Sequence, residues 1–165
     1  MIQVEHIEAQ DAWLPPLDVE IVPATTDHAR AIARDLRPMD LPCGRNATEA
    51  VANCLSVSRS AWAATDEAGR VICMWGIVCP SLLGARAEIW LLASRRVEDY
   101  LVRFARQAAA FVAEMQHQYP RLEANVAASN RVAVRFVRWL GFRPCGEFTI
   151  DGHRFLSFER APGEA

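Results

Sequence analysis

Apolar residues follow two different spacings along the chain, and each spacing predicts one type of secondary structure. Between residues 97 and 117 they recur three and four positions apart, which is typical of an amphipathic α-helix. The residues with this spacing are Leu101, Phe104, Ala108, Phe111, Val112 and Met115. Elsewhere, short apolar runs are separated by Gly, Pro, Asn or Asp, and such runs predict β-strands joined by turns.

These runs and helical stretches follow one another in a definite order. Strands are predicted at 19–23, 61–65, 71–80, 86–94, 122–129, 142–150 and 153–160. Helices are predicted from the cap-type residues 25–27 to Leu36, over 47–55, over 97–117 and over 130–140. The order is therefore β, α, α, β, β, β, α, β, α, β, β, which is a mixed α/β (α+β) fold.

One domain accounts for nearly the whole chain. A length of 165 residues suits a single domain with a substantial core. We expect this domain at residues 19–160. Residues 1–18 are expected to form a loosely structured amino-terminal arm, since Pro15 and Pro16 cannot continue a helix. Residues 161–165 are expected to form a short tail.

Composition and charge narrow the classes of function. The apolar fraction of 52% and the charged fraction of 23% are ordinary for soluble globular proteins. With 18 basic and 20 acidic residues the net charge is −2, so nucleic acid is not the expected partner. No apolar run is long enough to span a bilayer, and the opening MIQVEHIEAQ lacks the order of a secretion signal. These features predict a cytoplasmic protein without a membrane partner.

Cysteine and histidine are too scattered to predict a metal site. The five cysteines form no CxxC pair, and no two of the four histidines lie three or four residues apart. Buried free thiols are the simplest interpretation of the cysteines. We therefore expect no metal cofactor.

The stretch from Asn130 to Phe142 carries a motif. It reads NRVAVRFVRWLGF and resembles the late helix pattern N-x-x-A-hydrophobic-x-F-x-x-x-L-G-F of the GNAT N-acetyltransferase superfamily. Locally, Asn130 is expected to cap the helix, Ala133 to allow close approach to the sheet, and Gly141 to end the helix in a left-handed conformation. The resemblance extends over residues 19–160 and implies a mostly antiparallel central sheet with helices on both faces.

The same resemblance implies an acetyl-CoA-dependent N-acyltransferase that acts on an unidentified amine. Residues 86–93, RAEIWLLA, are similar to the fourth strand of the superfamily, whose main chain pairs with the pantetheine amides. Trp90, Leu91 and Leu92 would then bind the cofactor, and Asn130 would lie beside the pantetheine arm or serve only as a cap. Glu88 stands where some members have a general base; a solvated carboxylate at the strand end is the alternative.

The chain departs from the superfamily at the pyrophosphate loop. There the pattern R/Q-x-x-G-x-G/A lets main-chain N–H groups approach the phosphates, whereas residues 94–100 read SRRVEDY and contain no glycine. Glu98 and Asp99 add negative charge that repels a pyrophosphate. Arg95 and Arg96 could bind the phosphates through their side chains, or could simply be solvated.

A second departure concerns the tyrosine that often protonates the leaving thiolate in this superfamily. Its place falls on Val137, so Tyr100 or a water molecule would have to donate the proton. Arg131, Arg135 and Arg138 form a basic stripe on the last predicted helix. The stripe is either a solvated face or a contact for acidic protein, packaged DNA or the CoA 3′-phosphate, in which case Arg135 would bind the cofactor.

A narrower resemblance suggests a different function. The phrases SLLG, WLL, YPRLEANVAASN and FVRWLGF are similar to short GNAT-like internal virion and head-morphogenesis proteins of tailed bacteriophages. This resemblance implies a non-catalytic protein that contacts other virion proteins or a host protein, in the host cytoplasm or in the virion. The transferase and the non-catalytic interpretation both remain open at this point.

Overall fold

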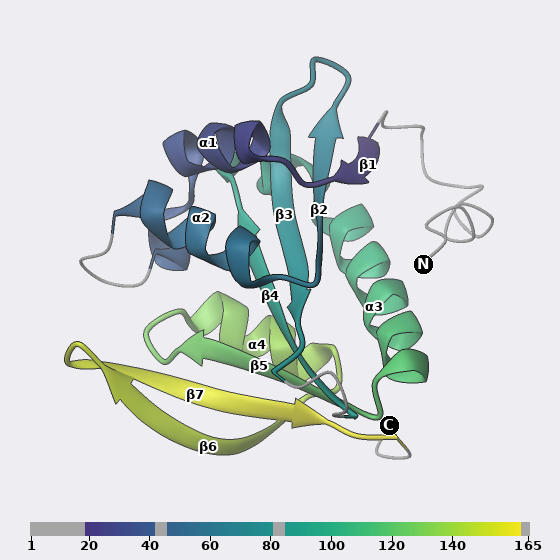
Figure 1. Ribbon diagram of the computed structural model, residues 1–165, viewed down its shortest axis with the longest axis vertical. Helices are drawn as coiled ribbons and strands as arrows, with labels where there is room; N and C mark the ends of the chain where they lie inside the picture. The colour runs from purple at the N-terminus through teal and green to yellow at the C-terminus, as the bar shows by residue number, and fades with distance from the viewer. Residues whose placement is uncertain (1–18, 42–45, 81–84, 163–165) are drawn as a thin grey trace.

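The computed structural model describes residues 19–41, 46–80 and 85–162. The strands are β1 (Val19–Pro23), β2 (Ser60–Asp66), β3 (Val71–Val78), β4 (Arg86–Ala93), β5 (Arg121–Ala127), β6 (Arg143–Ile150) and β7 (His153–Arg160). They form one sheet in the order β1-β2-β3-β4-β5-β7-β6 (Figure 1). Neighbouring strands are antiparallel except β4 and β5, which are parallel.

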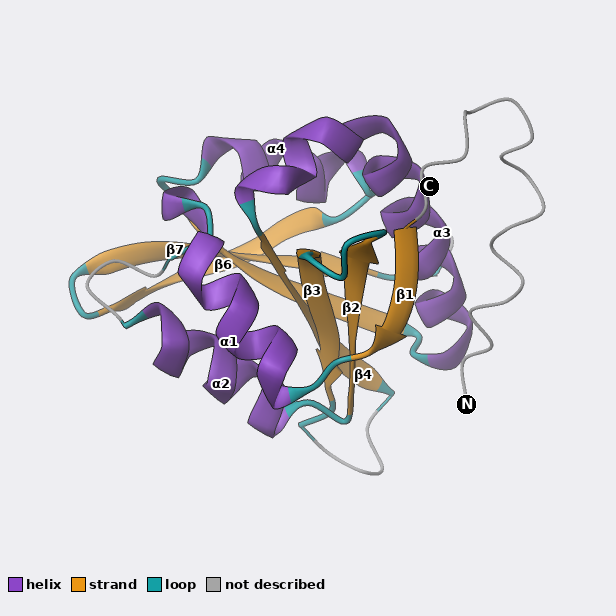
Figure 2. Cartoon of the chain, turned by 90° about the horizontal axis from the view of Figure 1, so that it is seen from above, coloured by secondary structure: helices purple, strands orange, loops and turns teal. Residues whose placement is uncertain are grey.

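Helices lie on both faces of this sheet. They are α1 (Thr26–Asp35), α2 (Ala47–Val57), α3 (Leu101–Gln118) and α4 (Arg131–Trp139). The pair α1 and α2 lies on one face, and α3 and α4 lie on the other (Figure 2). The predicted fold class and the predicted order of elements are therefore confirmed.

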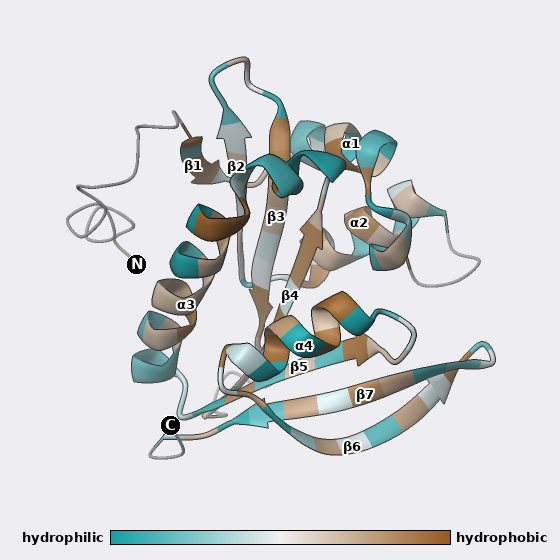
Figure 3. Ribbon diagram, turned by 180° about the vertical axis from the view of Figure 1, so that it is seen from behind, coloured by the Kyte–Doolittle hydropathy of each residue, from teal (hydrophilic) through white to brown (hydrophobic). Residues whose placement is uncertain are grey.

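Buried apolar clusters hold the helices on the sheet. Ile32 of α1 and Val51 of α2 pack with Met74 of β3, and all three are fully buried. On the opposite face, Met115 of α3 packs with Phe158 of β7 in a second cluster. Between the two helix layers, β4 is hydrophobic over most of its length (Figure 3). Each such fully buried side chain stabilises the fold by about 1.5–3 kcal/mol.

Local hydrogen bonds begin and end the helices as the sequence predicts. The Thr25 hydroxyl accepts from the main-chain N–H of His28 at the start of α1. At the start of α2 the cap is Asn46, whose side chain accepts from Thr48 N at 2.9 Å. The chain leaves α4 through Gly141, whose φ of +87° is the left-handed conformation expected there.

The helix predicted from residue 97 begins later in the structure, at Leu101. Residues Arg95–Tyr100 form a separate 3-10 helix instead. Val97, only 1% exposed, packs with Ile72 of β3 in a third buried cluster. Its apolar spacing therefore reflects contact with the sheet, which pattern alone cannot distinguish from membership of the helix.

One tryptophan lies at the surface. Trp139 at the end of α4 is 60% exposed and stacks on Phe136. The predicted arm at 1–18 lies outside the described residues, and so do residues 163–165 of the predicted tail.

Candidate active site between β4 and β5

β4 and β5 pair at one end only. Their register joins Arg86 to Arg121, Ala87 to Leu122 and Glu88 to Glu123. Beyond these pairs β4 stays beside β3 while β5 continues beside β7, so the two strands diverge (Figure 1). The divergence begins directly after Glu88.

The main-chain N–H and C=O groups of successive residues along β4 point alternately toward β3 and toward the side where β5 diverges. Arg121 N donates to Ala85 O at 3.0 Å on the β5 side, whereas Ser94 N donates to Ile72 O at 2.9 Å on the β3 side. Main-chain groups of a strand alternate in direction, so those of Ile89, Leu91 and Ala93 point to the β5 side. We call this edge, from Ile89 to Ala93, the free edge of β4. The main-chain groups of Trp90 and Leu92 point toward β3.

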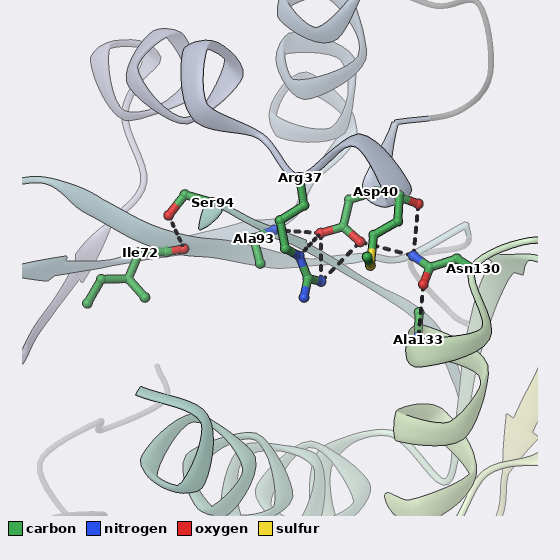
Figure 4. Close-up of polar contacts among 8 residues, drawn as sticks. Arg37, Asp40, Ile72, Ala93, Ser94, Asn130 and Ala133 are labelled. Carbon is green, nitrogen blue, oxygen red and sulfur yellow. Dashed lines mark hydrogen bonds and ion pairs between the residues drawn. The ribbon is translucent and has the colours of Figure 1, made fainter. Parts of the chain in front are cut away.

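The far end of the free edge is bonded to the segment that follows α1. Arg37 N donates to Ala93 O at 3.1 Å, and Ala93 N donates to Asp40 Oδ2 at 3.2 Å (Figure 4). Leu36 forms an isolated antiparallel bridge with Ser94. Residues 36–40, which end in a short 3-10 turn (Pro38–Asp40), therefore occupy the Ala93 end of the edge that β5 leaves unpaired.

Asp40 is the centre of this contact. Its carboxylate accepts from Arg37 Nε at 2.9 Å and from Arg37 Nη2 at 2.8 Å, and from Asn130 Nδ2 at 3.0 Å (Figure 4). The side chains of Asp40 and Arg37 are only 7% and 15% exposed. A buried carboxylate is stable only when donors surround it, and here they come from three parts of the chain.

Asn130 connects the same cluster to α4. Its Oδ1 accepts from Ala133 N at 3.0 Å, so the predicted cap is present. Its Nδ2 donates to Asp40 and also to Met39 O at 2.9 Å. Because both ends of this buried amide are bonded, Asn130 links the start of α4 to residues 36–40.

Glu88 lies at the other end of the free edge. Asn125 Nδ2 of β5 donates to Glu88 Oε1 at 2.9 Å, and Ser157 Oγ of β7 donates to Asn125 Oδ1 at 2.9 Å. The half-buried Glu88 shares its face of β4 with Trp90 and Leu92, which pack on the α1 and α2 side. Burial, followed by the charge of Glu88, raises the pKa of the Cys54 thiol, which places Glu88 near α2.

The remaining residues of β4 separate onto two faces. Trp90 Nε1 donates to Ser58 Oγ at 2.8 Å, and Ser58 Oγ donates to Cys54 O at 2.6 Å, both at the end of α2. Leu91 packs on the opposite face, against the same buried cluster as Tyr100. Glu88 and Tyr100, the predicted base and acid, therefore lie on opposite faces of the sheet.

The predicted phosphate contacts lie on the 3-10 helix and on α4. Arg96 forms an ion pair with Asp35 of α1 at 3.7 Å, whereas Arg95 is exposed. Ser94 makes no side-chain cap, because its hydroxyl donates to Ile72 O at 2.9 Å. Arg135 is exposed on α4. No small residue opens this turn, and Val97 fills its inner side.

Four residues of the site were not identified from sequence: Arg37, Asp40, Asn125 and Ser157. The segment containing Arg37 and Asp40 lies between two predicted helices, and its proline predicts only a break in the chain. Asn125 and Ser157 are ordinary strand residues, and only strand pairing brings them to Glu88. Neither pair carries a local signal for its partners.

Two classes of feature are absent from the part of the chain that the structure describes. No helix there has both the length and the apolar character needed to cross a bilayer. No three His, Cys, Asp or Glu side chains of residues 19–41, 46–80 and 85–162 gather as metal ligands would.

Solved structures of acetyltransferases share this fold at low sequence identity. A candidate acetyltransferase from Acinetobacter baylyi ADP1 superposes with a TM-score of 0.66 at 14% identity, over 92% of this chain and 97% of that chain. A chimera of the Vibrio cholerae spermidine N-acetyltransferase SpeG gives 0.63 at 12% identity, over 87% and 95%. A GCN5-related N-acetyltransferase from Kribbella flavida gives 0.59 at 15% identity, over 87% and 97%.

No protein-family model and no curated protein matches the chain. The structural likenesses nevertheless extend over most of both chains in each pair. The strand order, the divergence of β4 from β5 and these likenesses lead to one conclusion: this chain has the GNAT fold of the N-acetyltransferases.

Proposed function

We propose that the chain is an acyl-CoA-dependent N-acyltransferase, with acetyl-CoA as donor and an amine of a small molecule or protein as acceptor. One observation carries the proposal: β4 leaves β5 directly after a carboxylate that a neighbouring side chain holds in place. A carboxylate beside unpaired strand main chain combines a base with hydrogen-bond donors. These are the two functions that acyl transfer to an amine requires of the protein.

Glu88 is the base in this proposal. The bond from Asn125 holds one carboxylate oxygen, and the other oxygen can accept a proton from the amine, directly or through water. Since Glu88 shares its face with Trp90 and Leu92, the amine approaches from the α1 and α2 side. Tyr100 lies on the other face, on the α3 side. The leaving thiolate would therefore take its proton from Tyr100 if it lies on that side, and from water otherwise.

The free edge of β4 supplies the donors. The main-chain N–H groups of Ile89 and Leu91 point to the side where the strands diverge, and they can bind carbonyl oxygens of the acyl group and the pantetheine arm. Acetyl-CoA supplies the thioester. The residues present fit its pantetheine part better than its pyrophosphate, because the turn before α3 contains no small residue and carries Glu98 and Asp99. Arg95, exposed at the start of this turn, is the available phosphate ligand.

Titration calorimetry with acetyl-CoA tests this function. We expect a dissociation constant below about 1 mM, weakened about tenfold or more in the double variant Arg95→Ala, Arg96→Ala. Arg30→Ala is the matched control, because Arg30 is an exposed arginine of α1 with a local ion pair to Asp27. No detectable heat at about 1 mM acetyl-CoA, either with the wild type or with an Asp40→Ala variant that lacks the bond to Ala93, would overturn the proposal.

A second candidate is a non-catalytic protein of GNAT shape that acts through its surface. The turn without glycine and the bond between Asp40 and the free edge favour it. In this proposal the protein works in a phage virion or against a host protein, in the host cytoplasm. Glu88→Gln discriminates the two: it abolishes acetylation by a transferase, whereas binding by a non-catalytic protein stays unchanged.

A further inference from the structure

We propose that residues 36–40 form an internal latch, which occupies the Ala93 end of the free edge of β4 and which a pantetheine arm must displace to bind along the whole edge. The latch rests on the proposed transferase function and adds a mechanism that controls access to the same site. Its key residue is Asp40, which no feature of the sequence marked as functional.

The latch forms the hydrogen bonds that a ligand could form with the Ala93 end of the free edge. At Ala93 both main-chain groups are used, the C=O by Arg37 N and the N–H by Asp40 Oδ2. The other oxygen of Asp40, Oδ1, accepts a hydrogen bond from Asn130 Nδ2. Ala93 N–H and Asn130 Nδ2 are neutral donors that converge on one oxygen-bearing group, and an amide carbonyl presents the same kind of acceptor. The carboxylate of Asp40 therefore occupies a position that suits the carbonyl of a bound amide.

The contacts of the latch allow its middle to move away from β4 while its two ends stay in place. Leu36 and Leu41 anchor its two ends, since both pack in the cluster beneath α1 and α2. Between them, Pro38 and Met39 are exposed, and the contacts to β4 and α4 are hydrogen bonds. Arg37 and Asp40 form their ion pair within the segment. The pair therefore moves as one unit, and its release leaves neither charge buried without its partner.

Amide hydrogen exchange measures the latch without any ligand. In Asp40→Ala we expect the Ala93 amide to exchange at least about tenfold faster than in the wild type, because its acceptor is gone. The Ser94 amide is the internal reference, since it is bonded to Ile72 O on the β3 side and keeps that partner. Equal protection of Ala93 in both proteins would overturn the latch.

Titration of the same proteins with acetyl-CoA measures the consequence. We expect Asp40→Ala to bind about tenfold tighter than the wild type, and Asp27→Ala, which removes an exposed aspartate of α1, to bind as the wild type does. If Asp40→Ala leaves Arg37 unpaired and fails to fold, the double variant Arg37→Ala, Asp40→Ala removes both charges and takes its place.

The outcomes separate the latch from the function on which it rests. Tighter binding together with faster Ala93 exchange supports the latch. Equal binding by the wild type and the Asp40 variant overturns the latch and leaves the transferase proposal standing. Binding by neither protein at about 1 mM overturns the transferase proposal and the latch with it.

Discussion

At the scale of single residues, Asp66 and Asp40 are two buried carboxylates that differ in how far along the sequence their hydrogen-bond partners lie. Asp66 accepts from Ala68 N and Arg70 N, and Arg70 Nε lies 2.7 Å from it, so its partners are within four residues. Asp40 bonds to Ala93 and Asn130, which are 53 and 90 residues away. The turn at Asp66 could be predicted from the letters DEAG, but nothing near Asp40 indicates its partners.

The pKa of Asp66 leads to a prediction about acid stability. Burial raises this pKa, but the hydrogen bonds and charge of Arg70, with the bond from Ala68, outweigh burial and lower it below its ordinary value of 3.8. A lowered folded-state pKa stabilises the protein above pH 3.8, and this contribution is lost as the pH falls through the folded-state pKa.

We therefore expect Asp66→Asn to lower the free energy of unfolding by about 1–2 kcal/mol at pH 7. The difference from the wild type should shrink as the pH falls below about 4. Urea unfolding at several pH values measures it. A difference that grows toward acid pH would contradict the assignment, and Asp27→Asn, an exposed carboxylate, is the control.

At the scale of elements, the ring of Trp90 in β4 lies against Gly76, its partner residue in β3. A Cβ added to Gly76 of β3 would lie 2.7 Å from Trp90 Nε1 and 2.8 Å from two ring carbons. Trp90 cannot easily move, because its Nε1 is bonded to Ser58 at the end of α2. Gly76 is thus required for the packing of two strands and a helix, and its backbone conformation has no part in this.

Gly76→Ala should therefore destabilise the protein by about 1–3 kcal/mol. Gly146→Ala in β6 is a matched control, since an added Cβ there would meet nothing within 4 Å. Thermal unfolding of both variants tests the point. Equal melting temperatures for Gly76→Ala and the wild type would show that the Trp90 ring can shift.

At the scale of the whole molecule, the reactivity of the cysteine thiols shows whether the sheet stays folded. Cys73 lies in β3, an interior strand of the sheet, and is 4% exposed, and burial raises the pKa of its thiol to about 12. Cys145 lies on the edge strand β6 and is exposed. A thiol of this pKa carries almost no reactive thiolate near neutral pH.

We expect a thiol reagent at pH 8 to modify Cys145 in the native protein and to modify Cys73 only at the rate of global unfolding. Mass spectrometry of timed samples distinguishes the two sites. Modification of Cys73 as fast as Cys145 would mean that the centre of the sheet opens without unfolding of the whole. Cys145→Ser is the control for the assignment of the fast site.

The sequence by itself determined the class of the fold and the order of its elements, because each follows from local rules. Apolar spacing, the caps at Thr25 and Asn130, and the left-handed Gly141 act within a few residues. The motif that begins at Asn130 also indicated the superfamily whose fold the structure has. The role of Glu88 as a base was implied by the similarity of residues 86–93 to the fourth strand of that superfamily, and it stays a prediction.

Only the tertiary structure decided what surrounds Glu88 and what occupies the free edge of β4. Asn125 reaches Glu88 through the short parallel pairing of β4 with β5, and residues 36–40 reach Ala93 because β5 leaves that edge unpaired. Such contacts join residues tens of positions apart, and no local pattern encodes a partner at that distance. The same limit explains Val97, whose apolar side chain satisfied a helical spacing but packs on the sheet.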